Sequence, residues 1–178
     1  MVVSPYCTIG PFFPASFVEG HDDLTHHRGH TARGQHIVLS GRILQEGAVP
    51  TRNTILEIWQ ADANGVFSSC TGADPGFSGW GRARTDAEGW YRIRTVVPGS
   101  YSDRCPHANL MILAIGLTRR LVTTVFFADD PDAVRDPVLD CVADLAVRRR
   151  LFATREGPEA YRFDIILRGE NETPFFLD

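Results

Sequence analysis

Tyr101 and His107 lie six positions apart, immediately before a strongly apolar run, and both side chains can bind a hard metal ion. A phenolate supplies oxygen, which hard cations prefer, and imidazole is the commonest nitrogen ligand. The same residue types are also common in protein cores, half-buried and with the polar tip hydrogen-bonded. Residue types and spacing therefore leave two interpretations, half of a metal ligand set or an ordinary buried pair.

Residues 21–30 form a second candidate, because they hold four of the six histidines together with two aspartates. A metal site needs ligands that converge from a rigid frame and partners that orient them. This stretch is polar and rich in turn-forming residues, so we interpret it as a solvated loop. A metalloenzyme that uses His26 and His27 is the alternative.

Other classes of chemistry find no support in the sequence. It contains no nucleophile elbow of the G-x-S-x-G type and no glycine-rich phosphate loop after a strand, which argues against a hydrolase or a nucleotide-binding protein. A net charge of -4 without a charged tail argues against nucleic acid as a partner. The four cysteines lack the spacing of zinc sites, so we expect reduced thiols that pack: Cys7, Cys70, Cys105 and Cys141.

The chain of 178 residues suits one domain, with 43% hydrophobic and 22% charged residues in the ordinary globular range. The longest apolar runs, such as residues 110–117, are far shorter than the ~20 residues that span a bilayer. The N-terminus lacks the basic start and the apolar stretch of a signal peptide. These features predict a cytoplasmic protein without a membrane segment.

The elements that must position Tyr101 and His107 are strands. Several segments alternate apolar and polar residues and are separated by turn residues such as those of 86–89, a pattern typical of antiparallel sheets. The predicted strands are residues 36–44, 53–61, 90–97, 108–117, 121–127 and 161–169. Six or more strands with short turns predict an all-β fold, a two-layer antiparallel β-sandwich.

Residues 136–155 break the strand pattern. Asp136 is a candidate N-cap, Pro137 suits the first helical position, and the apolar residues that follow have helical spacing. This segment predicts one amphipathic helix. Residues 1–35, rich in Gly, Pro, His and Asp, predict an extended N-terminal arm, so that residues 36–178 form the sandwich of a single domain.

Six segments between Thr8 and the C-terminus carry a resemblance to one enzyme family. They are TIGPFF (8–13), LEIWQADANGVF (56–67), GWGRARTDAEGWYRIRTVVPG (79–99), PHANLMILAIGL (106–117), DPVL (136–139) and YRFDIILRGENETPFF (161–176). Together they resemble the intradiol ring-cleavage dioxygenases. Within that family they are most similar to the alpha chains of members that cleave protocatechuate.

The resemblance implies a function as well as a fold. Members of the family insert both atoms of O₂ into a catechol ring and give a cis,cis-muconate, in the β-ketoadipate route of aromatic catabolism. The resemblance implies a hetero-oligomer of alpha-beta pairs, in which the beta chain binds Fe(III) through two tyrosines and two histidines. The substrate, a small aromatic, would lie at the interface between the chains.

The resemblance also identifies the four ligand positions in this sequence. The tyrosine positions fall on Phe67 and Tyr101, and the histidine positions fall on His107 and Asn109. A phenyl ring has no oxygen, and a neutral amide is a much weaker ligand for a ferric ion than imidazole. We therefore expect this chain to hold no metal and no catalytic residue, with Tyr101 and His107 as remnants of a degenerate site.

Two further features follow from the resemblance. Thr8, Gly10 and Pro11 match a T-x-G-P segment of the alpha chain that helps to form the substrate pocket of the beta chain. Thr124 stands where related alpha chains often carry an arginine, and losing such a fork-shaped cation is not a conservative change. The alternative function is a β-sandwich module that binds small aromatics without any catalysis.

Overall fold

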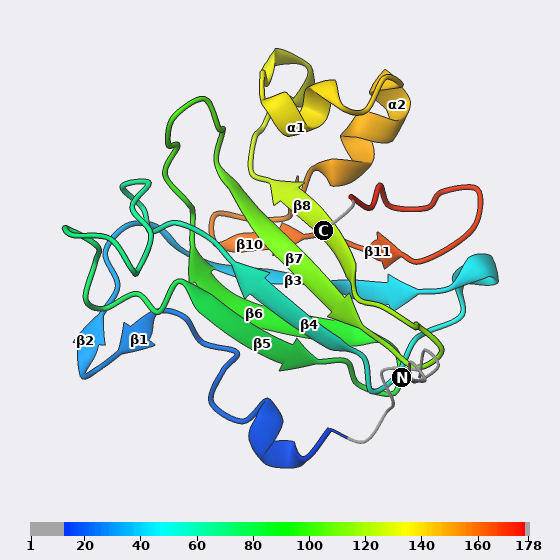
Figure 1. Ribbon diagram of the computed structural model, residues 1–178, viewed down its shortest axis with the longest axis horizontal. Coiled ribbons are helices and arrows are strands. Elements are labelled where there is room, and N and C mark those ends of the chain that lie inside the picture. Colours follow the sequence, from blue (N-terminus) through cyan, green and yellow to red (C-terminus); the bar gives the residue numbers. More distant parts are fainter. Residues whose placement is uncertain (1–12, 177–178) are drawn as a thin grey trace, which may run out of the picture.

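The computed structural model describes residues 13–176 and shows two packed β-sheets (Figure 1). In the first sheet β3 pairs with β6 on one side and with β10 and β11 on the other, and β9 pairs with β10. The second sheet has the strand order β5-β4-β7-β8. A small hairpin, β1 with β2, stands apart from both sheets.

The strands of the first sheet are β3 (His36–Leu44), β6 (Trp90–Val96), β9 (Thr154–Arg155), β10 (Ala160–Arg162) and β11 (Ile165–Ile166). Those of the second sheet are β4 (Ile55–Trp59), β5 (Trp80–Arg84), β7 (His107–Leu113) and β8 (Leu121–Phe126). The hairpin strands are β1 (His26–His27) and β2 (His30–Thr31). The helical elements are η1 (Ala15–Phe17), η2 (Glu46–Ala48), η3 (Pro131–Ala133), α1 (Pro137–Asp140), α2 (Leu145–Arg148) and η4 (Arg149–Leu151).

The predicted all-β sandwich is confirmed, and the strand at 36–44 has the predicted bounds. One local difference concerns the predicted strand at 161–169, which forms two short strands that run parallel to β3. Between them, the carbonyl of Phe163 approaches Gly41 so closely that a side chain there would clash with it. The Tyr91 hydroxyl donates to the same carbonyl, at 2.5 Å. This close approach interrupts the strand.

Strand β5 was not expected from the sequence. The two residues that face the core, Gly81 and Ala83, are small and give little apolar alternation. Their size has a structural reason, because a Cβ at Gly81 would lie 2.3 Å from the side chain of Leu24. Leu24 is fully buried, so the N-terminal segment contributes to the core. The division of the chain at residue 35 stays a prediction.

The single amphipathic helix predicted for residues 136–155 is wrong in detail. Asp136 caps α1 as expected, since its carboxylate accepts from the backbone N–H of Val138 at 2.9 Å. Asp144 then caps a second helix by accepting from Ala146 at 2.8 Å. An aspartate whose side chain bonds to the backbone favours the start of a helix over its interior. Asp144 therefore begins α2, and the segment forms two short helices instead of one. Consequently Leu145 is 62% exposed and does not join the core.

The apolar core lies between the two sheets, and the residues that alternate with it form their outer faces. A second, small apolar cluster joins β8 to the helical segment through Phe126, Leu139 and Leu151. This segment stands at one end of the sandwich (Figure 1). Within residues 13–176, no helix is long and apolar enough to span a membrane.

Candidate functional site

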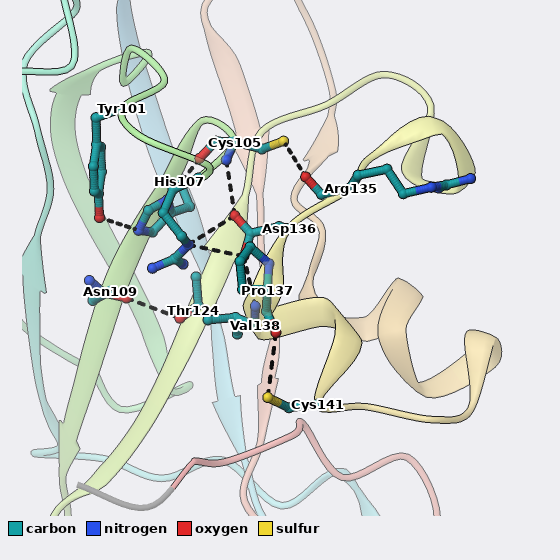
Figure 2. Close-up of polar contacts among 11 residues, drawn as sticks. Tyr101, Cys105, His107, Asn109, Thr124, Arg135, Asp136, Pro137, Val138 and Cys141 are labelled. Carbon is teal, nitrogen blue, oxygen red and sulfur yellow. Dashed lines mark hydrogen bonds and ion pairs between the residues drawn. The ribbon is translucent and has the colours of Figure 1, made fainter.

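The first candidate pair forms a direct contact. The Tyr101 hydroxyl lies 3.1 Å from Nε2 of His107, and Nδ1 of His107 lies 2.7 Å from the carbonyl oxygen of Cys105 (Figure 2). A carbonyl can only accept, so Nδ1 carries the proton and the neutral ring uses Nε2 as an acceptor. Tyr101 therefore donates to His107. Each residue occupies the atom that the other would offer to a metal.

Burial keeps both groups neutral. His107 is 3% exposed, and its removal from water lowers its pKa from the ordinary value. Burial also raises the pKa of Tyr101. Both shifts have the same cause, because a low-dielectric environment disfavours the charged form of either group. The pair is thus a neutral hydroxyl–imidazole hydrogen bond near neutral pH.

Asn109 and Thr124 form a second pair in the same region. The two residues are partners across β7 and β8, and the Thr124 hydroxyl donates to Oδ1 of Asn109 at 3.0 Å (Figure 2). Asn109 follows His107 by two residues, so both side chains are on the outer face of the sheet. Two of the three positions that depart from the resemblance, Asn109 and Thr124, are therefore in contact, and the amide oxygen of Asn109 is engaged.

Phe67 completes the group of four. Its ring stacks on Trp59 with 4.9 Å between centroids, and it meets the ring of Tyr101 edge to face at the same distance. The rings of Tyr101 and His107 are 5.4 Å apart. The structure thus brings the four residues to one corner of the sandwich: Phe67, Tyr101, His107 and Asn109. Aromatic packing and hydrogen bonds hold them there.

A buried carboxylate holds this corner in place. The side chain of Asp136 is inaccessible to solvent and accepts from both Arg104 Nε, at 2.9 Å, and the backbone N–H of Cys105, also at 2.9 Å. The same carboxylate caps α1 at Val138. Asp136 therefore ties the loop between Tyr101 and His107 to the helical segment. The sequence indicated only its capping role, because the contact with Arg104 joins residues 32 positions apart.

The donor set does not fit a ferric ion. Phe67 provides no oxygen, and the oxygen of Asn109 already accepts from Thr124. Tyr101 and His107 are the two strong donors that remain, and they are bonded to each other. In the part of the chain that the structure describes, no group of three or more His, Cys, Asp or Glu side chains could hold a metal.

The histidine-rich stretch is an ordered hairpin. His27 and His30 are partners across β1 and β2, and His26 and His30 are exposed. His26 lies 3.4 Å from the carboxylate of Asp23 at the surface. The predicted pocket residues Thr8, Gly10 and Pro11 lie outside the described residues. Among residues 13–176 the cysteines are free thiols: Cys70, Cys105 and Cys141.

Comparison with known proteins places this chain in a family. A family model described as dioxygenase matches residues 8–169. The chain is 39% identical over 160 residues to the protocatechuate 3,4-dioxygenase beta chain of Burkholderia cepacia, covering 79% of this chain and 68% of that protein. It is 36% identical over 155 residues to the alpha chain of the same enzyme from Pseudomonas putida, covering 82% and 77%. The chain belongs to the intradiol ring-cleavage dioxygenase family.

Solved structures agree with this intradiol dioxygenase fold. The dioxygenase domain of a dioxygenase and carbohydrate-binding protein fusion from Streptomyces sp. SirexAA-E superimposes with a TM-score of 0.62 at 26% identity. The superposition covers 92% of this chain and 96% of that domain. The intradiol dioxygenase sandwich therefore accounts for nearly all of the chain.

Proposed function

We propose that this chain is the non-catalytic alpha chain of an intradiol dioxygenase that cleaves protocatechuate or a related catechol. In this proposal a homologous beta chain binds Fe(III), and the iron activates the catechol ring toward O₂. The present chain supplies framework, interface and part of the substrate pocket. Thr8, Gly10 and Pro11 are the residues proposed to reach that pocket.

A single observation carries the proposal, namely the chemistry of the four residues at the ligand positions that the family resemblance implies. Phe67 has no donor atom, and Asn109 offers only a weak amide oxygen that already accepts from Thr124. Tyr101 and His107 bond to each other at 3.1 Å. Overall identity does not separate the two roles, because the chain is 39% identical to a beta chain and 36% identical to an alpha chain. The donor set is therefore the better guide to the role.

Thr124 bears on the choice of substrate. It is 4% exposed and bonded to Asn109, so this position carries no cation that could pair with a substrate carboxylate. In the proposed assembly the beta chain, or the segment around Thr8, binds that group. Both protocatechuate and catechols without a carboxylate therefore belong in the assay.

The test compares the purified chain with a co-purified pair. The chain alone is loaded with iron and dialysed, and it should retain far less than one iron per chain, show no phenolate-to-iron absorption band and cleave no catechol. Co-expression with a beta chain that carries two tyrosines and two histidines should give a coloured, active complex. One tightly bound iron and ring cleavage by the chain alone would refute the proposal.

A further inference from the structure

The helical segment at one end of the sandwich contains a pocket of about 270 Å³. It lies among η3, α1, α2 and η4, and its apolar lining is Val134, Leu139, Leu145 and Phe152. Arg135, which also lines the pocket, extends away from Tyr101 and His107 (Figure 2). The pocket therefore belongs to the helical segment and not to the four ligand positions.

The floor of the pocket is formed by the small apolar cluster of this segment. Leu139 is 2% exposed, and Val134 and Phe152 pack against the same cluster. Phe152 stacks on Phe126 with 5.4 Å between ring centroids, which holds its ring in place. Leu145, in contrast, is 62% exposed and extends the apolar lining toward solvent. Such a lining binds the apolar body of a ligand.

The same pocket is lined by three arginines and one carboxylate, namely Arg135, Arg148, Arg149 and Asp132. Two nitrogens of Arg149 donate to the Asp132 carboxylate, at 2.6 and 3.2 Å, so these two charges offset each other. The charges of Arg135 and Arg148 have no counterpart in the lining. The pocket is thus positively charged, although the whole chain has a net charge of -4.

Backbone carbonyls hold these two guanidiniums in place. Nη1 of Arg135 donates to the carbonyl oxygens of Asp132 and Val134, at 2.9 and 3.1 Å. Nε of Arg148 donates to a backbone carbonyl between α1 and α2, and its ion pair with Asp140 is long, at 3.7 Å. Among the residues that the structure describes, Arg135 pairs with no carboxylate. Its fixed guanidinium therefore keeps charged N–H groups for a carboxylate ligand.

The size and the lining of the pocket limit the ligand further. Sites for drug-sized molecules measure about 300–1,000 Å³, so a pocket of about 270 Å³ suits a compound with a single ring. Phe152 offers an aromatic surface on which a flat ring can pack. The carboxylate of Asp132 is already paired, so the hydroxyl groups of a sugar would lack acceptors. The complementary ligand is a small aromatic carboxylate.

We propose that this pocket binds a small aromatic carboxylate. Its ring packs against Leu145 and Phe152, and its carboxylate accepts hydrogen bonds from Arg135 and Arg148. This inference does not rest on the proposed function, because it requires neither iron nor a homologous chain.

The test titrates the full chain with benzoate and follows side-chain methyl signals by nuclear magnetic resonance. Benzamide has the same ring without the charge, and acetate has the charge without the ring. The methyl groups of Leu139 and Leu145 report binding in the pocket through the ring current of benzoate. Met111, which lies on the second sheet, reports binding elsewhere. Sodium chloride keeps the ionic strength equal in all titrations.

We expect saturable shifts of the Leu145 signals, with the Met111 signal unchanged. A ligand of this size should bind with a dissociation constant of about 0.1–1 mM, and benzamide and acetate should each bind at least about tenfold more weakly. Absence of saturation at about 10 mM benzoate would overturn the proposal. Equal binding of benzamide or acetate, or an equal shift of Met111, would also overturn it.

Variants of the lining provide an independent measurement. Arg135→Gln removes the charge and should weaken benzoate binding at least about tenfold, and Leu145→Ala should weaken it about threefold. Arg168→Gln is the matched control, because this arginine is 81% exposed and lines a different hollow beside η2. Arg135 and Leu145 are exposed, so both variants should keep the fold, which thermal unfolding checks. Unchanged affinity in Arg135→Gln, or an equal loss in Arg168→Gln, would refute the proposal.

Discussion

The hairpin of β1 and β2 and the start of β7 both contain histidine, yet they differ in how their side chains are held. The hairpin carries three histidines, of which His26 and His30 are exposed. The start of β7 carries one, His107, which is buried with hydrogen bonds to both ring nitrogens. The density of histidine in the sequence is therefore a poor guide to a built site.

The two regions differ in the groups that orient the histidine side chains. His107 bonds to the backbone of Cys105, which bonds to Asp136, which in turn pairs with Arg104. Such partners fix the orientation of a ligand or of a catalytic group. In the hairpin, the exposed His26 contacts only its sequence neighbours Asp23, at 3.4 Å, and Thr25, at 3.1 Å, among the contacts of the described residues. The contacts at the start of β7 thus hold His107 in one orientation, which the surface contacts of the hairpin do not do for His26.

The largest expected effect is the gain of a metal site. The double substitution Phe67→Tyr and Asn109→His adds a phenolate and an imidazole beside Tyr101 and His107. We expect binding of about one iron per chain and a phenolate-to-iron absorption band, whereas the parent binds none tightly. Adding Tyr101→Phe to the pair serves as the control and should weaken both iron retention and the band, because it removes one of the two phenolates. An iron-free double variant would show that the corner lacks the geometry of a site.

Removal of Asp136 should cause the next largest effect. Asp136→Ala leaves Arg104 and the Cys105 N–H without their buried acceptor and removes the cap of α1. Breaking a buried charge pair by removing one partner costs about 3–5 kcal/mol of unfolding free energy. Urea unfolding measures it, with Asp144→Ala as the matched control, an exposed helix cap worth about 1 kcal/mol. Equal losses in the two variants would contradict the anchoring role.

The buried His107 should make stability depend on pH. Because burial lowers its pKa in the folded protein, the unfolded chain binds the proton more readily than the folded chain. Stability contributed by the neutral ring is complete above the unfolded pKa of about 6.5 and is lost as pH falls from there toward the folded value. Unfolding of the protein and of His107→Asn, compared between pH 5 and 8, should show a shallower dependence in the variant. An unchanged slope would argue against a neutral, buried imidazole.

The smallest effect should come from the hairpin. The double substitution His26→Ala and His27→Ala removes side chains that the core does not use, so the unfolding free energy should change by no more than about 0.5 kcal/mol. Iron content and the activity of the co-purified complex should also remain unchanged. A loss of metal or activity would support the metalloenzyme alternative for residues 21–30.

The strands of the sandwich were largely predictable, since alternation is a local signal. Residues 36–44 and 90–97 alternate clearly and form β3 and β6. The outward position of Trp59 beside Glu57 was also visible as alternation, but its neighbour Trp80 was not, because β5 has only Gly81 and Ala83 toward the core. The cross-strand pairing of Trp59 with Trp80 therefore could not be predicted without the register of β4 and β5.

The types of side chain at the candidate site were determined by the sequence alone. Phenylalanine and asparagine at positions 67 and 109 fix the donor chemistry wherever these residues lie. The tertiary structure decided which groups use those atoms, namely that Tyr101 bonds to His107 and Thr124 to Asn109. It also decided that Asp136 holds the corner from 32 positions away. Composition and alternation are local properties of the chain, whereas cross-strand register and buried pairing depend on segments that meet only when the sandwich has formed.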